Sequence, residues 1–246
     1  STCSQRKEIN YERCLDEGTK SLKIGVIKNL ESFGISDSVL KAYEASLTIL
    51  ESLGHKLIEV DFSELSSGIC SYYVIAPAEC SSNLSRFDGV KFGHRTNKQQ
   101  DISELYMSTR AEGFGDEVKK RILIGTHVLS AGFYDAYYLK AQKVRRMIKN
   151  KFEEMYKDVD LIFMPTTLDQ AFEKNRQSED PNRMYKEDLL TIPANLAGLP
   201  AISFPNGFQN GLPTGGQLIG NYFQEDLLLQ LTNKIQEVTD WHKMTP

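Results

Sequence analysis

The chain has 246 residues, a length that suits one large domain or two small ones. Hydrophobic residues make up 40% of it and charged residues 25%, which excludes collagen-like, low-complexity and wholly disordered chains. The net charge of −4 argues against a general nucleic-acid binder, because phosphate contacts need a local excess of cations. No apolar run approaches the roughly 20 residues of a membrane span, and no secretory signal is recognisable. We therefore expect a cytoplasmic protein with no membrane contact.

The first third of the chain predicts a strand, a helix and a second strand. Residues 22–27 form a short apolar run that is typical of a buried strand. A helix with Ser36 or Asp37 as its cap follows and ends at Gly54, and residues 55–62 alternate as a second strand does. Short connections in this order make the two strands parallel and the crossover right-handed, which indicates the α/β class.

The middle of the chain is predicted to be helical. Residues 69–87 and 101–112 form two helical segments, and apolar residues then recur at threes, fours and sevens from Asp116 to Tyr156. That pattern predicts one long helix over 116–156. Residues 160–164 follow as a buried strand.

The last part of the chain predicts one loop, two helices and two short strands. In chain order these are a surface loop over 167–183, a helix over 186–197 that runs into Gly198, strands over 201–205 and 217–219 with the turn-rich segment 206–216 between them, and a helix over 225–239. We find no repeat and no linker. We therefore predict that residues 1–21 are a connecting segment and that 22–246 belong to a single domain.

A search for catalytic motifs finds little. No Gly-x-Ser-x-Gly elbow and no Walker loop is present, and Gly113-Phe114-Gly115 lacks the third glycine of a dinucleotide fingerprint. The cysteines and histidines are too scattered to predict a metal site. Composition and short motifs alone thus indicate only a soluble α/β domain.

Longer strings carry a family resemblance. In chain order they are Ser71–Ala76 with Glu79, Ser81–Gly89, Glu112–Gly115 on to Arg121, Leu129–Tyr138, Asp180-Pro181 with Met184-Tyr185, Asn195–Ala201, and Gln217–Gly220. Together they resemble the C-terminal half of the glutaminase component, the A subunit, of aspartyl/glutamyl-tRNA amidotransferases, which is a member of the amidase signature family. The resemblance spans nearly the whole chain from Leu22. It implies an amidase-type α/β fold, with a mixed central β-sheet flanked by helices, of which 22–246 form the C-terminal part.

The resemblance also implies where the nucleophile lies. In this family a serine, helped by a second serine and a lysine, cleaves the amide of glutamine, and all three lie in a Gly/Ser-rich segment upstream of the half resembled here. This sequence has no such segment, because its only Gly-Gly pair, Gly215-Gly216, has no serine beside it. We expect no catalytic residue in this chain, and we expect the isolated chain to be inactive because the Ser-Ser-Lys triad is absent.

Glutamine recognition is the role that the resemblance assigns to this half. A free amino acid carries a carboxylate and an ammonium, so its site needs one fixed cation and one fixed anion. By resemblance the cation is Arg121, the anion is Asp188, and the phenol of Tyr72 completes the substrate-binding site. Helical spacing places Lys120 opposite the apolar stripe and leaves both Lys119 and Arg121 at its flanks. Periodicity does not choose between those two, and only the resemblance selects Arg121.

A heterotrimeric ligase is the assembly that the resemblance implies. Glutamine is hydrolysed, and the ammonia passes to a tRNA-binding transamidase partner, which uses ATP and Mg to amidate Glu-tRNA(Gln) or Asp-tRNA(Asn). A third, small partner wraps the amidase, and this chain itself needs no cofactor. Two alternatives stay open: the C-terminal part of a stand-alone amidase, or a non-catalytic scaffold or binding fragment. The pair of Arg121 and Asp188 disfavours the stand-alone amidase, since a neutral amide needs no charged clamp at each end.

Overall fold

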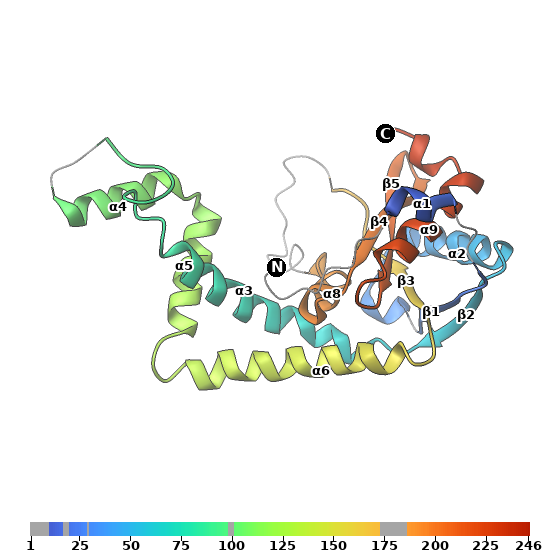
Figure 1. Cartoon of the computed structure of the whole chain (residues 1–246), viewed down its shortest axis with the longest axis horizontal. Helices are drawn as coiled ribbons and strands as arrows, with labels where there is room; N and C mark the ends of the chain where they lie inside the picture. Colours follow the sequence, from blue (N-terminus) through green and yellow to red (C-terminus); the bar gives the residue numbers. More distant parts are fainter. Residues whose placement is uncertain (1–9, 17–19, 29, 98–100, 173–185) are drawn as a thin grey trace. The chain divides into compact units, whose positions relative to one another are not determined.

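The computed structural model describes residues 10–16, 20–28, 30–97, 101–172 and 186–246 (Figure 1). The chain divides into two compact units. Unit 1 consists of Ser1–Ile69 and Met147–Pro246, and unit 2 of Cys70–Arg146. Most of the predicted loop over 167–183, and the strings at 180–181 and 184–185, lie outside the described residues. Within the described residues, no helix is both long and apolar enough to cross a bilayer.

Unit 1 is built on a five-stranded sheet of order β2-β1-β3-β5-β4. The strands are β1 (Lys23–Ile27), β2 (Lys56–Val60), β3 (Leu161–Pro165), β4 (Ala201–Gln209) and β5 (Leu212–Gly220). Strand β1 pairs in parallel with β2 and β3, whereas β5 pairs antiparallel with β3 and β4. The sheet is therefore mixed, and the predicted α/β class with a mixed central sheet is confirmed.

The predicted strand-helix-strand unit is present at the start of unit 1. Helix α2 (Asp37–Ser52) connects β1 to the parallel strand β2, and Gly54, with φ of 86°, ends the helix as expected. Ser36 occupies the N-cap position, but its hydroxyl makes no capping hydrogen bond, and its Oγ is buried with no partner among the described residues. Ser36 is therefore the N-cap residue, as one of the two predicted candidates, but its side chain does not satisfy the helix N-terminus. The Ser36 backbone N–H instead donates to the carbonyl of Leu168 at 2.9 Å.

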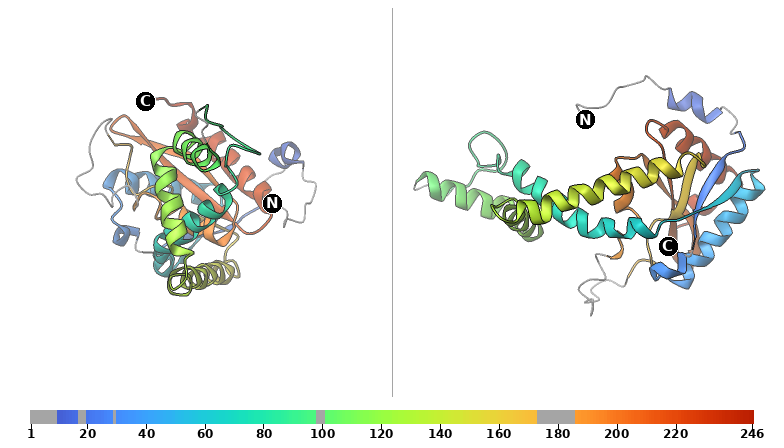
Figure 2. Two further views of the ribbon diagram at one scale, coloured as in Figure 1. Left: turned by 90° about the vertical axis from the view of Figure 1, so that its left-hand side faces the viewer. Right: turned by 90° about the horizontal axis from the view of Figure 1, so that it is seen from below.

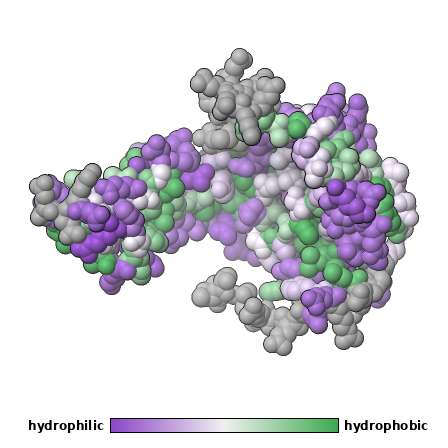
Figure 3. Space-filling model, turned by 90° about the horizontal axis from the view of Figure 1, so that it is seen from above, coloured by the Kyte–Doolittle hydropathy of each residue, from purple (hydrophilic) through white to green (hydrophobic). Residues whose placement is uncertain are grey.

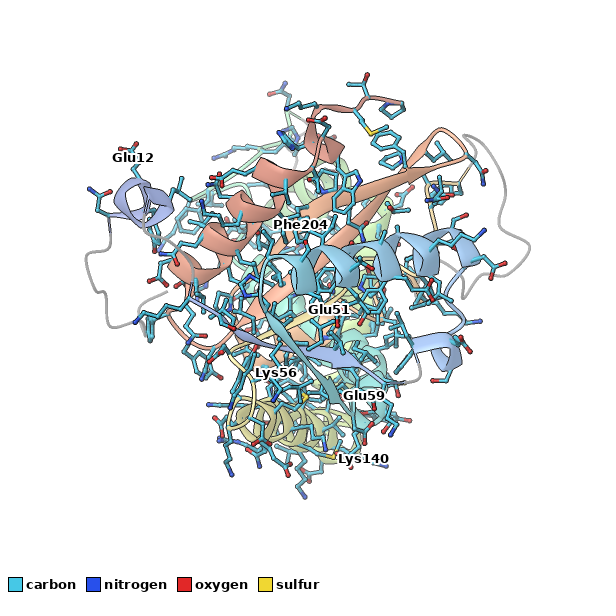
Figure 4. All side chains as sticks on the ribbon, turned by 90° about the vertical axis from the view of Figure 1, so that its right-hand side faces the viewer. Glu12, Glu51, Lys56, Glu59, Lys140 and Phe204 are labelled. Carbon is cyan, nitrogen blue, oxygen red and sulfur yellow. The ribbon has the colours of Figure 1, made fainter. Side chains whose placement is uncertain are left out.

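Helices cover both faces of the sheet. Helix α2 contacts four of the strands, and α9 (Glu225–Val238) contacts β4 and β5 on the same face (Figure 2). Here Tyr43 stacks on Phe163 at 5.3 Å, and Phe163 on Phe204 at 6.1 Å. Figure 4 shows α2 and α9 side by side in front of the strands, with Phe204 labelled between them. The second half of α6, from residue 147, and α8 (Ile192–Ala197) pack on the other face.

The predicted turn-rich segment 206–216 is mostly strand, which corrects the predicted bounds of both strands. Strands β4 and β5 continue through it and meet at Asn210 and Gly211, whose φ values are 54° and 79°. Two consecutive positive φ values are typical of the tight hairpin turn that Asn-Gly favours. Gly216 is needed for packing, because a Cβ there would lie 2.9 Å from the ring of Phe163.

Unit 2 is helical. Its elements are most of α3 (Gly68–Leu84), which begins in unit 1, then α4 (Ile102–Gly113), α5 (Asp116–Val128), a π-helix η3 (Tyr134–Leu139) and the start of α6 (Lys140–Met155). The single long helix predicted over 116–156 is therefore wrong, because the chain breaks after Val128. Ser130 Oγ donates to the carbonyl of His127 at 2.6 Å, and Gly132 adopts φ of 86°, a left-handed conformation that ends a helix.

Smaller elements also differ from the prediction. A short helix, α1 (Tyr11–Asp16), lies in the predicted connecting segment and packs along α9. Helix α8 is shorter than the predicted 186–197, since residues 187–191 form turns before it. Gly198, with φ of 74°, ends α8 as predicted. Three 3-10 helices complete the described chain: η1 (Leu30–Phe33), η2 (Ser63–Ser67) and η4 (Trp241–Lys243).

Candidate functional site

Two of the three predicted site residues lie on helices that cross within unit 2. Tyr72 belongs to α3 and Arg121 to α5. The crossing is very close, because a Cβ added to Gly125 of α5 would overlap the carbonyl oxygen of Pro77 of α3. Beside this contact, the hydroxyls of Ser81, one turn after Pro77, and of Thr126, next to Gly125, lie 2.9 Å apart. The backbones of the two helices that carry Tyr72 and Arg121 are thus held together directly.

Arg121 lies at the edge of the buried stripe of α5. Its Nε lies 3.4 Å from an Oε of Glu117, one turn earlier, and its side chain is 43% exposed. The side chain of Lys119 is 40% exposed and that of Lys120 is 56% exposed. The helix therefore turns Lys120 toward solvent, as its spacing predicted. Exposure alone does not distinguish Arg121 from Lys119. Arg121 lies one turn before Gly125, on the side of α5 that crosses α3, but its selection as the cation still rests on the resemblance.

Tyr72 is half-buried, and its ring packs edge-to-face with that of Tyr73, at a centroid distance of 5.1 Å and an interplanar angle of 82°. Edge-to-face pairs of this kind stabilise the orientation of both rings. The packing leaves Tyr72 only partly accessible, which suits a phenol that contributes one hydroxyl to a ligand.

Two residues in the family strings, Glu112 and Asp88, serve the structure of unit 2. Thr96 is buried and donates through Oγ1 to Glu112 at 3.0 Å, and the other oxygen of Glu112 lies 3.0 Å from His94 Nε2. Asp88 accepts the backbone N–H of Val90 at 2.8 Å, and this bond lowers the pKa of the Asp88 carboxyl. The contacts of Glu112 fasten the loop that follows α3 onto α4, and the Asp88 bond closes a turn within that loop.

Asp188, the third predicted site residue, belongs to unit 1. It is half-buried in the turn that precedes α8, and its carbonyl oxygen accepts the N–H groups of Thr191 at 3.2 Å and Ile192 at 3.0 Å. The backbone at Asp188 is thus fixed by the first residues of the helix. Tyr72 and Arg121 belong to unit 2, so the predicted meeting of Asp188 with them stays a prediction.

A polar hollow of about 330 Å³ lies beside this turn, within unit 1. Its polar lining comes from Thr166, Thr191, Asn195, Ser203 and Gln217, and the hydroxyls of Thr166 and Ser203 lie 2.8 Å apart. No role was predicted for these residues from the sequence. The one signal available was a glutamine inside an otherwise apolar strand, at Gln217. Among the described residues, no group of three or more His, Cys, Asp or Glu side chains could hold a metal ion.

Comparisons with known proteins agree with this architecture. The family model described as Amidase matches residues 1–229. The A subunit of the glutamyl-tRNA(Gln) amidotransferase of Hahella chejuensis (strain KCTC 2396) is 50% identical over 246 residues, which cover 100% of this chain and 51% of that protein. The protein of the same name from Methylococcus capsulatus is 48% identical over the same lengths. This chain spans about half the length of the curated relatives it matches.

Solved structures show the same fold. The crystal structure of the glutamyl-tRNA(Gln) amidotransferase A subunit from Thermotoga maritima is similar with a TM-score of 0.69 and 37% identity, over 93% of this chain and 45% of that one. A 6-aminohexanoate cyclic dimer hydrolase reaches a TM-score of 0.71 at 20% identity, over 99% of this chain and 50% of that one, and so shows the fold alone. The match of the family model over most of the chain, with these similarities, shows that the chain belongs to the amidase family.

Proposed function

We propose that this chain is the glutamine-recognising part of the A subunit of a tRNA-dependent amidotransferase. The observation that carries the proposal is the 50% identity over all 246 residues with a protein named as the A subunit of glutamyl-tRNA(Gln) amidotransferase. The amidase family by itself includes enzymes for many amides. The further choice of glutamine therefore rests on the side chains of Tyr72, Arg121 and Asp188.

The proposed site recognises the two charged groups of a free amino acid. The guanidinium of Arg121 can donate two parallel N–H bonds to the α-carboxylate, and the carboxylate of Asp188 pairs with the α-ammonium. The hydroxyl of Tyr72 adds one hydrogen bond. Arg121 is suited to exchange partners, because its described ion pair with Glu117 is half exposed, and such surface pairs contribute little free energy.

The proposed reaction uses a nucleophile from outside this chain. A serine oxygen of the remaining part of the amidase domain attacks the side-chain amide carbon of glutamine, and the C–N bond breaks as the nitrogen gains a proton. Water then hydrolyses the acyl-serine to glutamate. The ammonia passes to the tRNA-binding transamidase partner, which uses ATP and Mg to amidate the charged tRNA, and the small partner completes the cytoplasmic heterotrimer. This chain contributes no catalytic residue, and alone it should release no ammonia from glutamine.

The test is Arg121→Ala in the complete amidotransferase. Removing one member of a desolvated charge pair costs about 2–5 kcal/mol, so the KM for glutamine should rise by a factor of about 30 to several thousand. Arg121→Lys should restore only part of the loss, because an ammonium does not reproduce the two-pronged geometry of a guanidinium. Lys120→Ala is the matched control on the same helix, and it should leave the KM for glutamine unchanged.

Ammonium salts provide the second measurement. If Arg121 only binds glutamine, amidation of the charged tRNA with ammonium as the nitrogen donor should survive Arg121→Ala. Loss of both activities would mean that Arg121 supports the fold or the assembly of the complex, and the assignment would be wrong. Separately, ammonia release by the pure chain that a point substitution within it abolishes would contradict the proposed division of roles.

A further inference from the structure

The side-chain amide of Gln217 joins two segments of unit 1 that are far apart in the sequence. Gln217 is only 3% exposed, in the middle of β5. Its Nε2 lies 3.2 Å from the carbonyl oxygen of Pro165 and 3.0 Å from that of Leu190. Both N–H groups of one nitrogen are therefore used inside the protein, each on a backbone carbonyl.

The two carbonyls identify what Gln217 holds. Pro165 is the last residue of β3, the strand that pairs directly with β5. Leu190 is fully buried and lies in the turn that carries Asp188, two residues away. Within that turn, the Asp188 carbonyl accepts from Thr191 and Ile192. Gln217 thus fastens the Asp188 turn to the centre of the sheet from one side, while α8 holds it from the other.

A glutamine side chain suits this role for a chemical reason. Its amide nitrogen carries two N–H donors that can reach two carbonyls at once, whereas a glutamate offers only acceptors when ionised and an apolar side chain offers neither. A buried carbonyl that loses its donor bears the cost of desolvation, which is larger than the net contribution of a typical hydrogen bond. The turn can recover the lost hydrogen bond only by moving toward water.

We propose that Gln217 is a positioning residue for glutamine binding, which sets the place of Asp188 by holding the turn over Lys186–Thr191 against the sheet. This inference rests on the proposed function, because it takes Asp188 as the partner of the substrate ammonium. Gln217 acts through the backbone of Leu190. It is not assigned a contact with substrate.

The experiment uses Gln217→Met in the complete amidotransferase, because methionine has a similar length and no donor. The KM for glutamine should rise roughly 10-fold, which corresponds to the loss of about one buried hydrogen bond. The rate of amidation with ammonium as the nitrogen donor should change by less than about twofold. Hydrogen exchange at the amides of Thr191 and Ile192 should become faster, since they bond to the Asp188 carbonyl. Gln217→Asn is the second variant, and it should also raise the KM, because it keeps the donors but is one methylene too short to reach both carbonyls.

Asn206→Leu is the matched control. Asn206 is also a buried amide, on the neighbouring strand β4, and its Nδ2 donates to Ser46 of α2 at 3.1 Å. This substitution should lower the free energy of unfolding without changing the KM for glutamine or the exchange of Thr191 and Ile192. An equal rise in KM for the control and for Gln217→Met would overturn the proposal, because general destabilisation would then explain both.

Asp188→Asn separates the inference from the function on which it rests. If Asp188→Asn raises the KM for glutamine and Gln217→Met does not, the positioning role of Gln217 is wrong and the proposed function stands. If neither substitution changes that KM, the assignment of Asp188 is wrong and the inference falls with it. Unchanged exchange at Thr191 and Ile192 in Gln217→Met would also overturn the inference, whatever the kinetics.

Discussion

The two units of this chain are stabilised in different ways. Among the described residues, every large apolar side chain that is less than 2% exposed belongs to unit 1. They include Phe62, Phe152, Phe163, Ile24, Leu50, Leu65, Ile148, Leu161, Ile162, Met164, Leu190, Leu218, Ile219 and Leu231. Unit 1 also exposes some large apolar side chains, such as Phe172 at 71%. Unit 2 exposes others, such as Met107 at 67% and Leu123 at 71%, without a comparable core, and apolar patches interrupt its hydrophilic surface on the left of Figure 3.

Because their packing differs, the two units hold their predicted site residues in place by different contacts. In unit 1, a buried sheet and a buried amide fix the turn of Asp188. In unit 2, a close backbone crossing at Gly125 and a few polar contacts hold the helices that carry Tyr72 and Arg121. Unit 1 should therefore respond most to loss of buried apolar volume, and unit 2 to the addition of atoms at its crossing.

The largest expected effect is in the core of unit 1. Phe163 is fully buried and stacks between Tyr43 and Phe204, so Phe163→Ala should lower the free energy of unfolding by about 3–5 kcal/mol. Leu123→Ala in unit 2 is the comparison, and should change it by less than about 0.5 kcal/mol, because Leu123 is 71% exposed. Denaturant unfolding of both variants measures this. Similar losses in the two would refute the difference between the units.

Next comes the helix crossing in unit 2. Gly125→Ala places a methyl group on the carbonyl of Pro77, so the helices must move apart at a cost of about 1–3 kcal/mol. Since Tyr72 and Arg121 lie on these helices, the KM for glutamine in the complete enzyme should also rise. Gly113→Ala is the control, because its Cβ would meet only ordinary contacts, the nearest being His94 Cβ at 3.5 Å. An unchanged free energy of unfolding in Gly125→Ala would contradict the close crossing.

A smaller effect concerns the pH dependence of unit 1. His55 is buried, its Nδ1 accepts the N–H of Leu22 at 3.2 Å, and desolvation lowers its pKa below the ordinary 6.5. The folded state favours neutral His55, so this contribution to stability is complete above about pH 6.5 and is lost as the pH falls through the lowered pKa.

In His55→Asn, the amide oxygen can replace Nδ1 as the acceptor without titrating. Denaturant unfolding over about pH 5–7.5 should therefore show a smaller loss of stability on acidification in the variant than in the natural chain. Identical pH profiles would mean that His55 does not contribute to the acid sensitivity of unit 1.

The smallest effect tests the exposed pair in unit 2. Glu117→Gln removes the partner of Arg121 at 3.4 Å, and should lower the free energy of unfolding by only about 0.3–0.5 kcal/mol. In the complete enzyme the KM for glutamine should fall slightly, because a competing carboxylate is removed from Arg121. Asp116→Asn, which removes the partner of Lys119 at 3.5 Å, is the matched control and should leave the KM unchanged. A lower KM in the control alone would favour Lys119 as the cation.

Much of unit 1 could be predicted from local sequence. The apolar run at β1, the helix that Gly54 ends and the alternation at β2 identified the parallel pair correctly, because short connections leave few alternatives. Asn210-Gly211 favours a hairpin turn, but the glycines and proline around it are equally typical of an irregular turn-rich segment. In the structure those glycines lie within strands, where Phe163 occupies the space that a side chain at Gly216 would need.

Unit 2 was harder to predict, since periodicity records which face of a helix is apolar and not whether the helix continues. The apolar pattern from Asp116 to Tyr156 persists through the break at Ser130 and Gly132, so the pattern predicted one helix where the structure has three segments. Likewise, helical spacing puts Arg121 and Lys119 at the two flanks of the predicted apolar stripe, and in the structure their side chains are similarly exposed, at 43% and 40%.

The sequence by itself determined the α/β class, the order of the main elements and the family, because these depend on local patterns and on strings of residues that resemble the family. Only the tertiary structure decided which polar residues act across the fold. The Gln217 amide donates hydrogen bonds to the carbonyls of Pro165 and Leu190, and Gly125 packs on the carbonyl of Pro77. These partners are so far apart in the sequence that no local pattern predicts the contacts. The role of a buried amide or a glycine depends on which backbone segment lies against it. That contact forms only when the sheet and its helices pack together.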